Sequence, residues 1–269
     1  MRFLGCNVSR NVRLCSKRQR KAVACVQVMT ARTRKECAEV IYITGDTHRD
    51  FERVGDLAFS VGSTVDDVMV ILGDAGINYY GEPEDSELKA HLSELPISLL
   101  CIHGNHEMRP ESIGTYEEKE WRGGIVYYEA NFPDLLFAKD GEIYDLESRS
   151  CIAIGGAYSV DKYLRMLSGT ICWWPDEQPS EEIMQNVEAR LEAEGWKIDI
   201  VLSHTCPNRY IPRHAFLPFI AQGTVDNSTE EWLDYIESKL SYDHWFCGHF
   251  HTNETVDNIR FMFEDIIDL

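Results

Sequence analysis

Residues 40–48 read VIYITGDTH. The first five, Val40–Thr44, are all β-branched or aromatic, which predicts a β-strand. The strand runs directly into Gly45-Asp46-Thr47-His48, a turn that carries a carboxylate and an imidazole. A strand that ends on side chains of this kind is typical of a binding site at the carboxyl edge of an α/β sheet.

The same arrangement recurs along the chain, and amphipathic stretches with helical spacing alternate with the strands. This alternation predicts an α/β protein with substantially parallel pairing. Beyond the first strand, we expect strands at Val68–Leu72, Ser98–Ile102, Cys151–Ile154, Ile198–Leu202 and His244–Cys247. We expect helices at Asp85–Leu95, Glu181–Glu194 and Ser228–Leu240. At the last helix, Ser228 and Glu231 form a capping-box pattern.

Five of the six predicted strands are followed at once by side chains that bind metals or phosphates. Because ligands bind outside the carboxyl ends of the strands in α/β sheets, we expect the five turns to share one site. In chain order the turns are Gly45-Asp46-Thr47-His48, Gly73-Asp74, Gly104-Asn105-His106-Glu107, Ser203-His204 and Gly248-His249-Phe250-His251.

The residue types in these turns favour zinc, iron or manganese, because imidazole and carboxylate ligands occur together at such metals. Asp46 and His48 lie two residues apart, as do His249 and His251. In an extended segment, side chains two residues apart point the same way. We therefore expect each pair to bind one metal ion.

The motif order DxH, GD, GNHE, a later His and GHxH resembles that of the calcineurin-like metallophosphoesterases, over about residues 40–251. The resemblance implies a four-layer α/β/β/α sandwich with two mixed sheets. It also implies two divalent metal ions, for which we expect manganese, with iron or zinc as alternatives. Hydroxide bridging the two ions would attack the phosphate ester.

The resemblance also implies roles for individual residues. The first metal would be bound by Asp46, His48 and His251, the second by Asn105, His204 and His249, and both by Asp74. His106 would be catalytic, on the side of the leaving group, where an imidazolium can protonate or stabilise the departing oxygen.

One motif departs from the Ser/Thr protein phosphatase branch of that family. There the second motif resembles GDxxDRG, whose later Asp orients the catalytic His and whose Arg holds phosphate. Here Ile77 and Asn78 occupy those two places. The departure weakens a protein-phosphatase interpretation and leaves His106 without its expected carboxylate partner. Asp50 is a candidate to replace that carboxylate.

Candidate substrate contacts come from outside the five turns. Gly155-Gly156 opens the segment 157–178, rich in aromatic and charged residues, which is either a substrate wall or a long loop packed on the domain. Arg109 is the first candidate for a phosphate contact, because a guanidinium binds phosphate in a bidentate manner. Lys162 and Arg165 are further candidates.

Length and charge divide the chain into two parts. Residues 1–36 form a basic segment, since the first 35 contain ten Lys or Arg and no Asp or Glu. We expect a poorly ordered extension there, with an organellar transit peptide as the alternative. Residues 37–269 then form one catalytic domain. Over residues 36–269 the net charge is −29, which disfavours long nucleic acids as partners.

The nine cysteines form no CxxC pair and their number is odd, so neither a disulfide framework nor a thiolate zinc site is predicted. A reducing cytoplasm fits this cysteine usage best. No apolar run approaches the roughly 18 residues that a membrane-spanning helix needs. We therefore expect a cytoplasmic protein with no membrane partner and no assigned oligomeric state.

Three functions remain open at this point. The leading hypothesis is a phosphomonoesterase whose substrate is a small phosphorylated molecule or a phosphoprotein. The alternative is a phosphodiesterase that acts on a cyclic nucleotide or another small diester, since one metal centre can serve both ester classes. The third is a non-catalytic scaffold, since a fold does not imply its function. The presence of all seven ligands and His106 argues against the scaffold, because decay would erode the ligands first.

Overall fold

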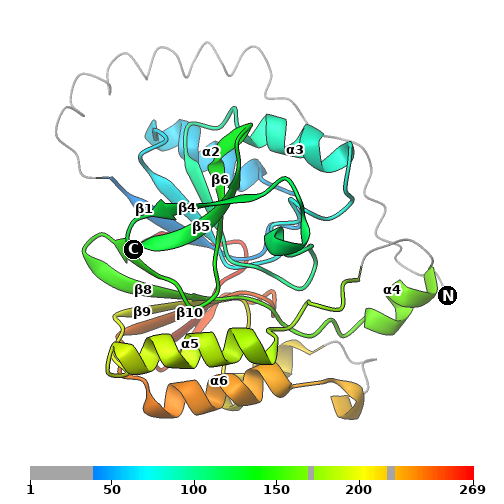
Figure 1. The fold of residues 1–269 in the computed structure, drawn as a ribbon, viewed down its shortest axis with the longest axis vertical. Helices are drawn as coiled ribbons and strands as arrows, with labels where there is room; N and C mark the ends of the chain where they lie inside the picture. Colours follow the sequence, from blue (N-terminus) through cyan, green and yellow to red (C-terminus); the bar gives the residue numbers. More distant parts are fainter. Residues whose placement is uncertain (1–38, 169–172, 217–221) are drawn as a thin grey trace. The chain divides into compact units, whose positions relative to one another are not determined.

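A computed structural model describes residues 39–168, 173–216 and 222–269 (Figure 1). The basic extension predicted for residues 1–36 lies outside them, as does part of the segment 157–178. Within the described residues the chain forms two mixed β-sheets, one of seven strands and one of six.

The first sheet has the strand order β13-β1-β2-β3-β6-β5-β4. Its central strands β1, β2, β3 and β6 run parallel, whereas β13, β5 and β4 pair antiparallel with their neighbours. The strands are Ile41–Thr44 (β1), Val68–Ile71 (β2), Ser98–Cys101 (β3), Glu117–Trp121 (β4), Gly124–Glu129 (β5), Phe132–Ala138 (β6) and Ile266–Asp268 (β13).

The second sheet has the strand order β11-β12-β10-β9-β8-β7. Its four central strands run parallel, and the two edge strands, β11 and β7, pair antiparallel. The strands are Ile143–Leu146 (β7), Arg149–Ile154 (β8), Ile200–Ser203 (β9), His244–Cys247 (β10), Glu254–Val256 (β11) and Ile259–Phe261 (β12).

Helices cover the outer face of each sheet (Figure 1). The α-helices are Glu52–Val61 (α2), Glu84–Leu92 (α3), Lys162–Ser168 (α4), Glu181–Ala193 (α5) and Ser228–Lys239 (α6). Short 3-10 turns lie at Pro110–Ser112, Asn208–Tyr210, Arg213–Ala215 and Gln222–Thr224. None of the helices in the described part of the chain is both long and apolar enough to cross a membrane.

The hydrophobic core has three parts, which follow from the alternation of side chains along each strand. In β2, Val68 and Val70 contribute to the core between the two sheets, whereas Met69 and Ile71 contribute to the core beneath α2 and α3. A third core joins the second sheet to α5 and α6. The layers are therefore helices, sheet, sheet and helices, and the predicted α/β/β/α sandwich with two mixed sheets is confirmed.

All six predicted strands and all three predicted helices are present, with ends within three residues of the expected ones. The predicted capping box at α6 is wrong. The residue before the helix is Asn227, whose side chain makes no capping hydrogen bond. Instead, a carboxylate oxygen of Asp226 accepts the backbone N–H of Ser228 at 3.0 Å.

Candidate metal centre

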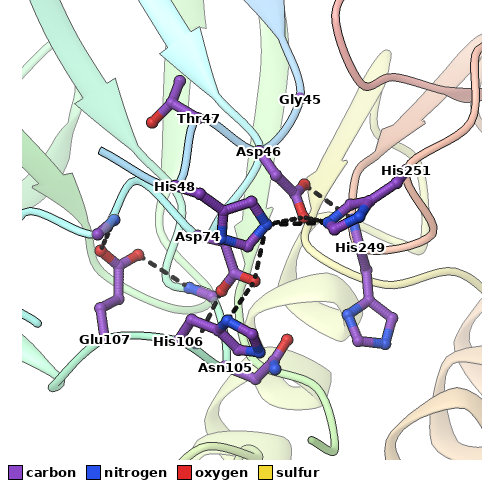
Figure 2. Close-up of polar contacts among 12 residues, drawn as sticks. Gly45, Asp46, Thr47, His48, Asp74, Asn105, His106, Glu107, His249 and His251 are labelled. Atoms are coloured by element: carbon purple, nitrogen blue, oxygen red, sulfur yellow. Dashed lines mark hydrogen bonds and ion pairs between the residues drawn. The ribbon is translucent and has the colours of Figure 1, made fainter. Parts of the chain in front are cut away.

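The five turns meet at the carboxyl ends of the parallel strands, as predicted. Figure 2 shows residues of the turns after β1, β2, β3 and β10, and the turn after β9 joins them through His204, whose Nε2 lies 2.8 Å from Asn105 Oδ1. Backbone N–H groups of one turn donate hydrogen bonds to the acidic side chain of another turn. His249 donates its backbone N–H to Asp46 Oδ1 at 2.9 Å, which joins the turns after β10 and β1. His106 donates its backbone N–H to Asp74 Oδ1 at 2.8 Å, which joins the turns after β3 and β2.

Glycines at the start of these turns permit the close approach. A Cβ atom added at Gly104 would lie 2.1 Å from the backbone nitrogen of Asp74. One added at Gly248 would lie 2.3 Å from Oδ1 of Asp46. No side chain fits at such distances, so the glycine that precedes a ligand in these two motifs has a steric reason to be there.

Asp46, His48 and His251 form the first ligand group. The Nε2 atom of His251 lies 3.1 Å from Asp46 Oδ2, and His48 Nε2 lies 3.7 Å from the same oxygen. The two imidazole Nε2 atoms are 2.9 Å apart. Burial opposes ionisation of Asp46, but the hydrogen bond to His251 and the nearby His204 keep its pKa below the ordinary value.

Asn105, His204 and His249, which the family resemblance assigns to the second metal ion, form the second candidate ligand group. The Nε2 atom of His204 lies 2.8 Å from Asn105 Oδ1. The ring of His249 packs against that of His204, with 5.0 Å between the centroids. His204 and Asn105 are fully buried, which places this group deeper than the first.

Asp74 lies between the two groups. Its Oδ1 atom is 3.6 Å from His204 Nε2, and its Oδ2 atom is 3.9 Å from His48 Nε2. The carboxylate is buried, which disfavours its charge, but the neighbouring imidazoles of His106, His204 and His48 hold its pKa well below the ordinary range. One carboxylate thus faces both groups with different oxygens.

The expectation that His249 and His251 would bind one metal together is wrong. Their backbones are not extended, because both adopt positive φ angles, +66° and +50°. The imidazole of His251 packs against His48, whereas that of His249 points toward the second group (Figure 2). The family resemblance likewise implied that His249 and His251 bind different metal ions.

Backbone strain is concentrated at this site. His48 and Asp74 also have positive φ angles, +45° and +47°. Non-glycine residues rarely adopt this region, and such residues cluster where the surroundings hold a functional geometry in place. Four of the seven candidate ligands therefore have backbones that only the tertiary contacts of the turns maintain.

The donor atoms fit bound cations. The Nδ1 atom of His204 lies 2.8 Å from the carbonyl oxygen of Leu72, an acceptor, so Nδ1 carries the proton. In the neutral ring, Nε2 then presents a lone pair to Asn105 Oδ1, an atom that is also only an acceptor. Two lone pairs that face each other at 2.8 Å repel, and a cation bound by both atoms removes that repulsion.

His106 lies beside this centre, and a nitrogen of its ring also clusters with ligand-type atoms of His48 and Asp74, within 4.8 Å of one another. Its Nδ1 atom is 3.8 Å from Asp74 Oδ2, and Nη2 of Arg165 lies 3.0 and 2.9 Å from its two ring nitrogens. Burial lowers the pKa of His106; Asp74 opposes that change, and the charges of Arg165 and His48 add to it. The imidazole is therefore held between a carboxylate and a guanidinium.

Neither Asp50 nor the altered motif residues orient His106. Asp50 is exposed, and its carboxylate accepts the backbone N–H of Glu52 at the start of α2. Ile77 is buried in the core beneath α2 and α3, and Asn78 accepts a hydrogen bond from the Tyr116 hydroxyl at 2.9 Å. The suggestion that Asp50 replaces the missing carboxylate is therefore wrong.

Glu107 has a role that the motif alone did not reveal. Its buried carboxyl group accepts the backbone N–H groups of Gly104, at 3.2 Å, and Gly76, at 3.0 Å. Burial and the nearby Asp74 raise its pKa to about 8, and the backbone N–H groups oppose this rise. Through these two hydrogen bonds, Glu107 connects the turn after β2 to the turn after β3.

Arg109 has different partners from those expected. Its guanidinium is buried, pairs with Asp140 Oδ2 at 2.7 Å and donates to the backbone oxygen of Asp176 at 2.8 Å. These partners engage Nε and Nη1 of the guanidinium, and none of its described hydrogen bonds or ion pairs joins it to a candidate metal ligand, so the structure gives no support to its predicted phosphate contact. Arg109 instead ties the turn after β3 to the loop between β6 and β7.

The other two substrate candidates lie on or near α4. The Nζ atom of Lys162 lies over the Trp173 ring, 4.3 Å from its centroid, and 5.4 Å from that of Tyr158. Arg165 contacts His106 and also binds Asp161 through Nε at 2.7 Å. Of the three basic residues predicted, Arg165 is the one whose described contacts reach the candidate centre.

Comparison with known proteins identifies the family of the chain. The model of the calcineurin-like phosphoesterase family matches residues 40–253. Among solved structures, the chain is similar to a phosphopantetheinyl hydrolase from Mycobacterium tuberculosis, at 12% identity over 84% of this chain and 88% of that one, with a TM-score of 0.46. It is also similar to a protein of unknown function from Aquifex aeolicus, at 15% identity over 62% and 81%, with a TM-score of 0.30. No curated protein matches the chain.

Proposed function

We propose that this chain, which belongs to the calcineurin-like phosphoesterase family, is a phosphomonoesterase that works with two divalent metal ions. Family membership and the clustered ligand-type side chains already indicate metal-dependent hydrolysis of a phosphate ester. The observation that carries the proposal is the position of Asp74. Its two carboxylate oxygens face two separate groups of ligand atoms, which suits a pair of ions that share one carboxylate.

The residues that would hold each ion follow from the two groups. Asp46, His48 and His251 would bind the first ion, Asn105, His204 and His249 the second, and Asp74 both. Bound there, the two cations supply Lewis-acid stabilisation of the phosphoryl group and lower the pKa of water to near neutrality. We propose manganese, because mixed carboxylate and imidazole ligands suit it.

His106 and Arg165 would act on the side of the leaving group. Asp74 and Arg165 together hold the His106 imidazole at the edge of the ligand groups, where a proton can be delivered to a departing oxygen. The Arg165 guanidinium adds a positive charge that is not a metal ligand. A phosphomonoester carries up to two negative charges, so this extra cation supports a monoester over a diester.

The charge of the chain supports a compact substrate. Over residues 36–269 the net charge is −29, which repels extended polyanions. A small phosphorylated molecule or a phosphorylated side chain of a protein would need only the local positive charge of the metals and Arg165.

The test compares two esters that share a leaving group. Metal-depleted protein is reloaded with Mn²⁺, and the hydrolysis of p-nitrophenyl phosphate is compared with that of bis-p-nitrophenyl phosphate. We expect Mn²⁺-dependent turnover with a higher kcat/KM for the monoester. A higher kcat/KM for the diester would favour the phosphodiesterase alternative and overturn the proposal.

Metal analysis separates catalysis from a scaffold role. We expect two Mn²⁺ ions per chain after loading and removal of free metal. Fewer than one ion per chain, together with no hydrolysis of either ester, would favour a scaffold that has kept the fold without its chemistry.

A further inference from the structure

The segment that follows β8 reaches the second ligand group. Gly156 donates its backbone N–H to the carbonyl oxygen of His103 at 2.8 Å, and Ala157 donates to that of Glu177 at 3.1 Å. At Gly156 a Cβ atom would lie 2.6 Å from the Glu177 carbonyl oxygen. These contacts hold the segment against the turn after β3, and they bring Ser159 to Asn105.

The contact between Ser159 and Asn105 is buried and specific. Asn105 donates its side-chain Nδ2 to Ser159 Oγ at 2.9 Å, and both residues are 1% exposed. On its other side, the Asn105 amide presents Oδ1 to His204 Nε2. Each end of the amide therefore has one described side-chain partner.

This contact determines which end of the amide faces the ligand group. An amide has a donor end and an acceptor end of nearly equal size, and only the oxygen can bind a cation. If the amide were rotated by 180°, Nδ2 would point at the cation. Acceptance by Ser159 Oγ stabilises the orientation in which Oδ1 points there, and a hydrogen bond at Nδ2 also polarises the amide toward its oxygen.

The Ser159 hydroxyl has an acceptor other than the amide. Its Oγ donates to the backbone carbonyl oxygen of Asn105, at 3.5 Å. With its proton directed there, Ser159 Oγ keeps a lone pair for the side-chain Nδ2 of Asn105.

We propose that Ser159 is a positioning residue for the second metal ion, because it holds the Asn105 amide with its oxygen toward that ion. Ser159 belongs to none of the five motif turns and lies 54 residues from Asn105. The proposal rests on the proposed function, since it requires an ion at Asn105. Hydrogen bonds to metal ligands of this kind typically alter metal affinity by 10- to 100-fold.

The experiment is a titration of the metal-depleted chain with Co²⁺, in which binding is measured by calorimetry and by visible absorption. Two variants are compared with the wild type. Ser159→Ala removes the acceptor, and Ser159→Cys keeps nearly the same volume but offers a weak acceptor. In both, we expect the Kd of one Co²⁺ ion to rise about 10- to 100-fold and that of the other to stay unchanged.

Ser63→Ala is the matched control. Ser63 is also a buried serine, and its Oγ donates to the carbonyl oxygens of Pro96, at 2.7 Å, and Ala58, at 3.1 Å. It lies at the amino ends of β2 and β3, the opposite end from the ligand groups. We expect lower stability in Ser63→Ala and two unchanged Kd values for Co²⁺.

Asn105→Ala provides the reference for loss of the ligand itself. Adding Ser159→Ala to Asn105→Ala should cause no further rise in either Kd, because the positioned side chain is already gone. A further rise would mean that Ser159 acts on the metal by another route.

Three outcomes would count against Ser159. They are wild-type Kd values in folded Ser159→Ala and Ser159→Cys, equal weakening of both ions, and wild-type binding in Ser159→Cys alone, which would indicate a packing role. A wild-type chain that binds no Co²⁺ would instead overturn the proposed function. The two failures are therefore distinguishable, and neither depends on ester hydrolysis.

Discussion

At the scale of single residues, Asp74 connects the two ligand groups, and its substitution should affect both. Asp74→Asn keeps the shape of the side chain but replaces one oxygen with an amide nitrogen, which cannot bind a cation. We expect fewer than one Mn²⁺ ion per chain, measured by metal analysis after loading, and no detectable hydrolysis of p-nitrophenyl phosphate.

Asp67→Asn is the control for this substitution. Asp67 is also buried, but it accepts the backbone N–H groups of Val40 and Thr64 at the amino ends of β1 and β2. Its substitution should lower stability and leave two Mn²⁺ ions bound. If Asp74→Asn also kept two ions, the assignment of Asp74 as the shared ligand would be incorrect.

His106 should separate turnover from metal binding, since the family resemblance assigns it to neither metal ion. His106→Ala removes a candidate proton donor, which typically costs 10²- to 10⁴-fold in rate. We expect kcat for p-nitrophenyl phosphate to fall within that range and the Mn²⁺ content to stay at two per chain. His91→Ala, at an exposed position of α3, should change neither quantity. Loss of metal in His106→Ala would mean that His106 is itself a ligand.

At the scale of elements, four of the five turns carry a glycine that another part of the chain approaches closely. Gly104→Ala would place a Cβ atom 2.1 Å from the backbone of Asp74, so the turns after β2 and β3 must move apart. We expect a loss of about 3 kcal/mol or more in the free energy of unfolding, measured with urea.

Gly114→Ala is the matched control, because a Cβ atom there meets nothing within 4 Å. The free energy of unfolding should change by less than about 0.5 kcal/mol. Equal effects of the two substitutions would show that the close approach of the turns is not what requires glycine at position 104.

The short helix α4 contributes to the site through Arg165. Arg165→Met removes the positive charge beside His106 but keeps most of the side-chain length. We expect kcat/KM for p-nitrophenyl phosphate to fall about 100-fold, as for removal of one preorganised donor, with unchanged Mn²⁺ content. Arg209→Met, which breaks an exposed pair with Asp234, should change kcat/KM less than twofold. An unchanged kcat/KM in Arg165→Met would remove this residue from the mechanism.

The elements that the sequence did not predict include the four edge strands β4, β7, β11 and β13. The strand β4 reads EEKEW and has no buried residue, because it lies at the edge of its sheet. Edge strands and short antiparallel strands bury one face at most, so they lack the continuous apolar run that marks the central parallel strands. Of the parallel strands in the described part of the chain, six were predicted, because both of their faces are covered, whereas β6 and β12 were not.

At the scale of the whole molecule, burial between layers gives stability a specific pH dependence. Glu230 in α6 is 4% exposed, and one of its carboxyl oxygens accepts a hydrogen bond from Thr205, the residue after His204. Burial raises its pKa from 4.5 to about 7, although the Thr205 hydroxyl opposes the rise. Between these two pH values the folded chain keeps a proton that the unfolded chain has released.

The stability that this proton contributes is therefore complete below pH 4.5 and is lost as the pH rises through 7. Glu230→Gln stays neutral throughout. We expect the free energy of unfolding of Glu230→Gln, relative to wild type, to rise by about 3 kcal/mol from pH 4.5 to 7.5 in urea titrations. Parallel pH profiles of the two proteins would contradict a raised pKa for Glu230. Changes in metal affinity with pH affect both proteins and cancel in the difference.

Local patterns along the chain determined which residues are available for chemistry. Asp46, Asp74 and Asn105 each follow a glycine and lie within four residues of the end of a strand, and in parallel strands this places them at a common edge. The fold class, the five turns and their convergence follow from information within about ten residues of each strand end. Strand length and hydrophobic periodicity carry that information.

Only the tertiary structure decided how those residues are arranged. His249 and His251 separate into different groups because their positive φ angles are maintained by contacts between turns, not by local preference. Arg109 pairs with Asp140, 31 residues along the chain, and the side chain of Asn105 donates to Ser159, 54 residues along. The packing of the two sheets brings such partners together. The spacing of residues along the chain does not predict which distant groups meet in a buried layer.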